Sequence, residues 1–419
     1  MIDGLRCRSP LGQPKLQETP AEVAMDLLAD DRTETGDDSA RSPVGTAYSA
    51  RRDPGEAARE LARQLQHSEL GFVLFFCSAE YSLEALGPAM DAAFEDTPVS
   101  GCTTAGEITP AGYCRGCIVA IGFDRRAFAV AHTLIDDLEG FGLLQAQRLT
   151  GELLESCRQA SSALEGGQRF VLTLLDGLSS SEEQVLATLD TALGTIPSFG
   201  GSAGDDNRLA YTHVYSKGRF HSESAVVVMF QTRLPFEVFT THHLRPRREK
   251  LVVTRADCER RRVLELNAAP AAAEYARLVG LPVTSLNPAI FASHPLAVRI
   301  GEQHYVRSIQ GANEDGSLSF YCAVENGIVL TAMQPAPLLE DLRLTLDGLR
   351  ERLGEPALIL GCDCFLRRLE LEALGQVDEA SKLLGQAGVV GFNTYGEQHH
   401  GMHINQTLTG VAIGSVPTA

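Results

Sequence analysis

Three histidines and a methionine lie within five positions of one another near the C-terminus, in the stretch GFNTYGEQHHGMHINQTLTGVAIG. They are His399, His400, Met402 and His403. Imidazole and thioether groups are ligands for borderline and soft metal ions and for haem iron. The same side chains are also common on exposed loops at the edge of a sheet. The spacing alone therefore leaves both interpretations open.

The cysteines form two further candidate sites. Cys362 and Cys364 are separated by one residue in a predicted strand, so their side chains point to the same face. Cys322 lies in another predicted strand, and three converging thiols would bind zinc or respond to oxidation. The alternative is that the three are small core residues. Cys114 and Cys117 have the spacing of a redox pair, but they follow a glycine-rich loop and not a helix start, so we interpret their spacing as coincidental.

Two similar glycine-rich loops occur in the N-terminal half, GCTTAGE (101–107) and GGSAGDD (200–206). Such loops let the backbone approach a ligand closely, with amide groups free to bind an anion. A tight turn that only connects two elements is the alternative. Neither loop contains the P-loop or the dinucleotide-binding pattern. The candidate ligand-binding residues are Gly101, Thr103, Thr104, Gly106, Glu107, Gly201 and Gly204, together with Arg307.

The elements around these loops indicate an internal duplication. Phe72-Val73-Leu74 and Phe170-Val171-Leu172 begin two predicted strands that lie 98 positions apart. Each is followed by a helix, a glycine-rich loop and a β-rich stretch. We therefore predict a domain of two related units over residues 55–243, an exposed linker over 244–250 and a second domain over 251–416. The expected fold class is α/β to α+β, with mixed sheets, flanking helices and two lobes.

The composition indicates a cytoplasmic protein. Residues 1–52 are rich in Pro, Asp, Ser, Thr and Arg, which predicts a disordered tail. A net charge of −18 over 419 residues argues against binding to nucleic acid. The sequence lacks both a secretory signal and an apolar run of about 18 residues, so we expect no insertion into a membrane. Hydrolase motifs are also missing, and Glu182 and Glu183 look like helix-start residues, so we predict no catalytic residues.

Longer segments resemble the FIST sensory domain. GCTTAGEI resembles its N-terminal half, and YVRSI, DGSLSFY, GIVL, YGEQ and NQT resemble its C-terminal half, over about residues 65–414. Within the family, ELNAAPAAAEYARLVG and GCDCFLRRLE are similar to the haem-binding, nitric-oxide-sensing branch. The resemblance implies a sensor without enzymatic activity that binds haem b and nitric oxide. It also implies a partner histidine kinase or cyclic-di-GMP enzyme, in two-component control of biofilm formation.

The resemblance further implies which residues hold the haem. The QHF pattern of the family corresponds to His242, His243 and Leu244, so His243 is the expected axial ligand and His242 is the alternative. The other residues expected at the cofactor are His403, which is the second choice for the axial ligand, and Tyr395, Glu397 and Asn405. His399 and His400 correspond to variable positions and are expected to be exposed.

Two other hypotheses remain open at this point. The first is a redox sensor in which Cys322, Cys362 and Cys364 bind zinc. The second is a module that binds an amino acid or a similar metabolite through the glycine-rich loops and Arg307. The sequence also leaves open the partner and whether the chain forms a homo-oligomer.

Overall fold

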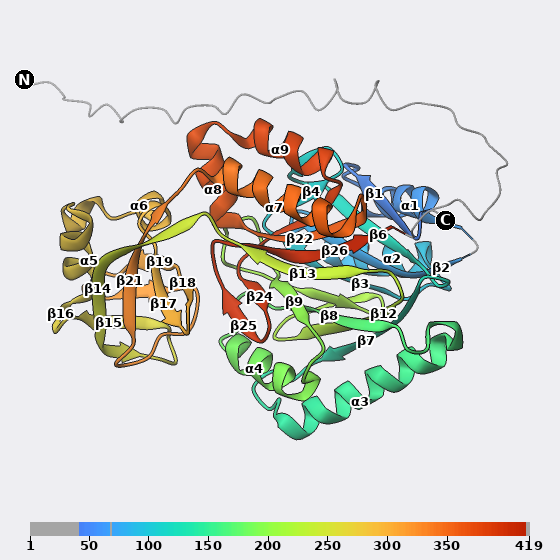
Figure 1. The fold of residues 1–419 in the computed structure, drawn as a ribbon, viewed down its shortest axis with the longest axis horizontal. Helices are drawn as coiled ribbons and strands as arrows, with labels where there is room; N and C mark the ends of the chain where they lie inside the picture. Colours follow the sequence, from blue (N-terminus) through green and yellow to red (C-terminus); the bar gives the residue numbers. More distant parts are fainter. Residues whose placement is uncertain (1–41, 68, 416–419) are drawn as a thin grey trace, which may run out of the picture. The chain divides into compact units, whose positions relative to one another are not determined.

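The structure, a computed structural model, describes residues 42–67 and 69–415 (Figure 1). These residues form three six-stranded sheets and one eight-stranded sheet with helices packed around them, so the predicted mixed fold class is confirmed. None of the helices within these ranges combines the length and apolarity needed to cross a membrane.

The predicted duplication is a triplication. Each repeat consists of an edge strand, a helix, a central strand, one or two helices, a parallel strand, a short hairpin and a closing antiparallel strand. The first repeat contains β1 (Val44–Ser49), α1 (Pro54–Leu65), β2 (Leu70–Ser78), α2 (Leu83–Ala93), β3 (Val99–Thr104), β4 (Glu107–Thr109), β5 (Gly112–Cys114) and β6 (Ile118–Asp124). The second contains β7 (Phe128–Ile135), α3 (Leu143–Ala160), β8 (Gln168–Leu175), α4 (Glu182–Leu193), β9 (Ser198–Ser202), β10 (Val214–Ser216), β11 (Arg219–His221) and β12 (Ala225–Thr232).

The third repeat is interrupted by an inserted sheet. It contains β13 (Phe236–Thr241), α7 (Leu338–Leu353), β22 (Pro356–Cys364), α8 (Phe365–Leu374), α9 (Val377–Gln386), β23 (Val389–Thr394), β24 (Glu397–His399), β25 (Met402–Ile404) and β26 (Leu408–Gly414). The insert lies between β13 and α7 and contains β14 (Leu244–Asp257), β15 (Arg262–Leu266), β16 (Ala269–Pro270), α5 (Ala271–Val279), α6 (Pro288–Ser293), β17 (Leu296–Ile300), β18 (Gln303–Arg307), β19 (Ile309–Ala312), β20 (Leu318–Phe320) and β21 (Val329–Pro335).

The three repeats exchange their hairpins in a cycle. The β4–β5 hairpin of the first repeat pairs with β23 of the third, and β10–β11 of the second pairs with β3 of the first. The β24–β25 hairpin of the third repeat pairs with β9 of the second. Every one of the three sheets is therefore completed by a strand pair from another repeat. The glycine-rich loops before the hairpins consequently lie next to one another.

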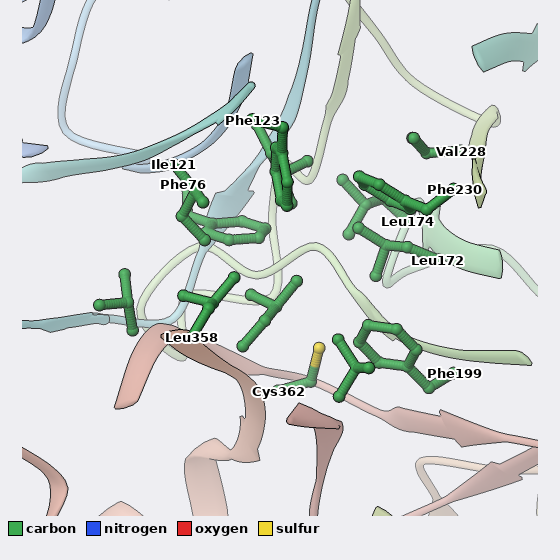
Figure 2. Packing of buried hydrophobic residues seen from close by; sticks show 14 of the residues in the cluster. Phe76, Ile121, Phe123, Leu172, Leu174, Phe199, Val228, Phe230, Leu358 and Cys362 are labelled. Carbon is green, nitrogen blue, oxygen red and sulfur yellow. The ribbon is translucent and has the colours of Figure 1, made fainter. Parts of the chain in front are cut away.

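One apolar core fills the space between the three sheets. Figure 2 shows Phe76 and Phe123 from the first repeat, Phe199 and Phe230 from the second, and Leu358 from the third packed in this core. The strands are apolar on both faces because helices cover the other face, which explains runs such as LGFVLFFCS in β2. Burial of this shared core holds the repeats together.

Two predicted boundaries are wrong. Residues 44–49 fall in the expected disordered tail, but they form β1, which pairs with β6; residues 1–41 lie outside the described part of the chain. The expected linker 244–250 is the first half of β14, which pairs with β21. The pairing with β21 is interrupted by a bulge between Pro246 and Lys250, and the charged side chains of this stretch are mostly exposed although the chain runs in the sheet.

Candidate functional site between the inserted sheet and the second repeat

A pocket of about 210 Å³ lies where the inserted sheet meets the second repeat, and we call it the seam pocket. Its lining includes Arg260, Arg261, Gln310 and Tyr321 from the insert, and Leu178 and Ser180 from the loop before α4. The two arginines lie in the turn between β14 and β15. This turn is held by the Asp257 carboxylate, which accepts a hydrogen bond from the Arg260 amide at 3.2 Å.

Arg261 connects the seam pocket to a buried ionic network. Its Nη2 donates to Glu183 Oε2 at 2.6 Å, and its Nη1 donates to the Tyr321 carbonyl at 2.7 Å. Glu182 Oε2 lies 3.9 Å from the same guanidinium. The two glutamates are the first residues of α4, where the positive end of the helix dipole favours their charge. The turn of the insert is thus fastened to the second repeat by one arginine.

His403 joins the network from the third repeat. Its Nδ1 lies 3.1 Å from Glu183 Oε1, and its main-chain carbonyl accepts a 2.9 Å hydrogen bond from Arg307. Its Nε2 is buried and has no hydrogen-bond partner among the described residues. Nε2 faces Gly396, where an added Cβ atom would overlap it. Two of the predicted site residues, His403 and Arg307, therefore lie together.

Within this network the pKa values of the two neighbouring glutamates shift in opposite directions. Burial raises the pKa of Glu182 to about 7, with His403 and Arg261 acting in the opposite direction. Burial also acts to raise the pKa of Glu183, but the hydrogen bond from His403 and the nearby charges of His403 and Arg261 outweigh it, so this pKa is lowered. Glu183 is therefore the anion that Arg261 and His403 share.

Asn405 and Cys322 extend the contact between the insert and the third repeat. Asn405 Oδ1 accepts hydrogen bonds from the Cys322 thiol at 3.0 Å and from the Ser308 amide at 3.3 Å. Its Nδ2 donates to the Tyr395 carbonyl at 3.4 Å, and the Tyr395 hydroxyl donates to Asp205. These predicted residues therefore link the third repeat to the insert and, through Tyr395, to the second repeat.

His243 and His242 lie elsewhere, at the junction of β13 and β14. The His243 ring is buried, and Arg367 Nη1 lies 3.3 Å from its Nδ1, while its Nε2 lies 2.9 Å from Glu370 Oε2. His242 is half-buried, and its Nδ1 accepts a hydrogen bond from the Leu244 amide at 3.3 Å. Burial lowers the pKa of His242.

His243, the expected axial ligand, does not fit haem in this conformation. A haem ligand needs an imidazole nitrogen that is free and faces an apolar pocket. Both nitrogens of His243 are already occupied by Arg367 and Glu370. His403 has a free Nε2 and a carboxylate on Nδ1, as metal-ligating histidines do. However, Gly396 blocks Nε2, and the groups around the ring are charged.

The three cysteines predicted to bind zinc are not arranged as a metal site. Cys362 packs in the core shared by the repeats, Cys364 packs with Phe365 and Tyr395, and Cys322 donates to Asn405. Within residues 42–67 and 69–415, no group of three or more His, Cys, Asp or Glu side chains could hold a metal ion. Burial raises the pKa of all three thiols, so they behave as core residues.

The glycine-rich loops bind one another. The Ala105 amide donates to the Asn393 carbonyl at 2.8 Å, and the Gly204 amide donates to the Thr103 carbonyl at 3.0 Å. A Cβ atom on Gly101 or on Gly106 would collide with a neighbouring chain segment. The remaining predicted loop residues, Thr104, Glu107 and Gly201, and also Glu397, are buried as well. The loops that the sequence predicts to bind an anion therefore form contacts between repeats in the structure.

The histidine cluster at the C-terminus is divided by the β24–β25 hairpin. His400 is exposed, as expected, and His399 is half-buried beside it. His403 points inward to Glu183 because it follows the turn of the hairpin. Only one of the three histidines thus reaches the candidate site.

Gly396→Ala tests whether His403 is fixed in this way. The added methyl group would displace the imidazole from Glu183, so we expect a loss of about 1–3 kcal/mol in the free energy of unfolding. Urea denaturation measures this loss. The matched control is Gly151→Ala in α3, where a Cβ atom meets nothing within 4 Å. A Gly396→Ala protein as stable as this control would mean that the His403 ring lies elsewhere.

Comparison with known families identifies two adjacent domains, whose matches meet inside the insert. The FIST N domain matches residues 71–269, which hold most of the first repeat, all of the second, the first strand of the third and the start of the insert. The FIST C domain matches residues 271–400, which hold the rest of the insert and much of the third repeat. A comparison with curated proteins gives no significant match. Because the two matches follow each other and together span most of the sequence, the chain belongs to the FIST-domain proteins, a family of sensory modules that bind small ligands in signalling.

Proposed function

We propose that the protein senses a small polar metabolite that binds in the seam pocket. One observation carries this proposal: Arg261 lines the pocket and also holds the insert to the second repeat through Glu183. A ligand that contacts this guanidinium therefore acts on the bond between two parts of the fold. The chain signals by this binding and not by catalysis.

The lining of the pocket favours a zwitterion such as an amino acid. Glu259 and Arg260 place opposite charges side by side, and Gln310 and Tyr321 add an amide and an aromatic ring. Pockets for drug-sized ligands measure roughly 300–1,000 Å³, so a pocket of about 210 Å³ suits a smaller molecule. A carboxylate on the arginines and an ammonium group on Glu259 would satisfy both charges.

Binding would bias the insert between two positions. A ligand carboxylate competes with Glu183 for Arg261, and Glu183 released from Arg261 keeps only His403 and the Ala323 amide as partners. The ligand can shift this balance only by binding one position more tightly than the other. The changed surface would be recognised by a partner protein, for which a histidine kinase or a cyclic-di-GMP enzyme is our proposal.

Haem remains a second candidate because of one observation, the free and buried Nε2 of His403 whose Nδ1 is held by Glu183. The chain at Gly396 would have to move before this nitrogen reached iron. Titration with hemin tests this candidate. A Soret band that is lost in His403→Ala but kept in His243→Ala would establish His403 as the ligand and would replace the metabolite proposal. We expect no such band.

Arg261→Gln tests the metabolite proposal. Calorimetric titration with a panel of amino acids and small carboxylates should find a ligand for the unmodified protein. Loss of a charge-assisted contact should weaken its binding by about tenfold or more. Arg262→Gln is the matched control, because this neighbouring side chain pairs with Asp315 and does not line the pocket. If the two variants bind the metabolite equally well, the ligand site is not the seam pocket.

A further inference from the structure

Cys114 and Cys117 lie at the two ends of the turn between β5 and β6. Gly116 adopts φ +72° in this turn, which folds the chain back and places the two thiols next to each other. Cys114 is half-buried, and its thiol contacts the Arg115 carbonyl on the exposed side of the turn. Cys117 is buried behind it. One thiol is therefore accessible and the other is protected.

A buried carboxyl group lies directly behind the second thiol. Glu107 Oε2 is 3.4 Å from the Cys117 sulfur and also accepts from the Cys117 amide at 3.4 Å. Glu107 Oε1 accepts a 2.5 Å hydrogen bond from the Thr104 hydroxyl. Burial raises the pKa of Glu107 to about 8. The neighbouring Cys117 thiol lowers the pKa of Cys114, and Cys114 in turn raises the pKa of Cys117.

The third repeat shows that the fold does not need these thiols. Glu397 pairs with Ile404 in the β24–β25 hairpin as Glu107 pairs with Cys114 in β4–β5. Glu397 Oε2 accepts from the amide and the hydroxyl of Thr407, as Glu107 accepts from the amide and the thiol of Cys117. The same buried glutamate and turn thus form with isoleucine and threonine, so structure alone does not explain two cysteines in the first repeat.

We propose that Cys114, Cys117 and Glu107 form a dithiol–disulfide exchange site whose substrate is a low-molecular-weight disulfide. The Cys114 thiolate attacks one sulfur of the substrate, which forms a mixed disulfide and releases one thiolate. Glu107 then accepts the proton of Cys117. The Cys117 thiolate attacks the Cys114 sulfur, which closes the Cys114–Cys117 disulfide and releases the second thiolate. The dithiol is oxidised by two electrons and the substrate disulfide is reduced to two thiols.

The exchange is tested with glutathione disulfide on protein in which Cys7 and Cys258 are replaced by serine. Alkylation followed by mass spectrometry should show Cys114 and Cys117 converted together to an intramolecular disulfide. Cys117→Ser should stop at the glutathione adduct of Cys114, and Cys114→Ser should not react. If Cys114 reacts no faster than Cys258 does in the unmodified protein, or if Cys117→Ser accumulates no adduct, the proposal is overturned.

Glu107→Gln tests the proton acceptor, and Glu397→Gln is the matched control for removal of a buried carboxyl group. We expect closure of the disulfide to slow by about a hundredfold in Glu107→Gln only, as loss of a general base does. The rate of closure in the unmodified protein should also rise with pH, reach half of its maximum near pH 8 and level off above that pH. This profile serves as the test if Glu107→Gln does not fold. Equal rates in the two variants, or a profile without this rise, would show that Glu107 only supports the turn.

Discussion

Replacing Asp363 by alanine is expected to lower the free energy of unfolding by about 3–5 kcal/mol, the usual cost of leaving one partner of a buried ion pair alone. Asp363 Oδ1 accepts from Arg367 Nε at 2.8 Å, and both side chains are almost completely buried. Asp363 Oδ2 accepts from the Tyr113 hydroxyl at 2.6 Å. The alanine variant would therefore leave a cation and a phenol without their shared acceptor.

Urea denaturation measures this effect, and the exposed pair of Glu155 and Arg158 on α3 provides the control. Glu155→Gln should leave stability unchanged, because solvent screens an exposed pair. The double variant Asp363→Leu with Arg367→Met should recover much of the loss, because it removes both charges together. A single Asp363→Ala variant as stable as Glu155→Gln would mean that the buried pair is not formed.

The first two repeats could be predicted because the central strand of each contains the same apolar triplet and is followed by a similar glycine-rich loop. The third repeat has equivalent parts in Leu358-Ile359-Leu360 and in the loop before Glu397. It was not recognised because the insert separates β13 from α7, and because this loop has Tyr395 in place of the small residue Ala105 or Ala203. A repeat split by an insertion loses the constant spacing on which its detection depends.

The candidate site was less predictable, because it is built from segments far apart in the chain. Glu183 and His403 are separated by 220 positions, and Arg261 comes from the insert. The residue pattern identified His403 and Arg307 as unusual, but the pairing of strands decides what they face. In the sequence, Glu182 and Glu183 indicate only the beginning of a helix. The best available signal in the sequence was the concentration of charged residues at Glu259–Arg262. These arginines are not part of a predicted helix, in which they could pair with acidic residues one turn away.

Raising the pH from about 5 to 8 is expected to destabilise the protein through Glu107, whose pKa burial raises to about 8 from an ordinary value of 4.5. Between these values the unfolded chain has lost the proton while the folded chain keeps it. Stability therefore falls as pH rises, by up to about 1.4 kcal/mol per pH unit, and levels off above pH 8. Glu182 acts in the same direction up to about pH 7.

Histidines oppose this trend in the lower part of the range. Burial lowers the pKa of His399 to about 4, so below about pH 6.5 the unfolded chain binds a proton that the folded chain does not. This contribution makes stability rise with pH. The dependence of the free energy of unfolding on pH is therefore the sum of contributions with opposite slopes. A comparison of the unmodified protein with one variant isolates a single group.

Glu107→Gln supplies that comparison, because glutamine keeps the size of the side chain and cannot release a proton. Measured by urea denaturation at several pH values, the stability of the unmodified protein relative to the variant should fall by up to about 4 kcal/mol between pH 5 and 8. Parallel curves would show that Glu107 is ionised throughout this range. Glu107 could still accept the Cys117 proton in that case. The rate of disulfide closure would then not change with pH through the titration of Glu107. The stability curve and the exchange rate thus report on one proton through independent measurements.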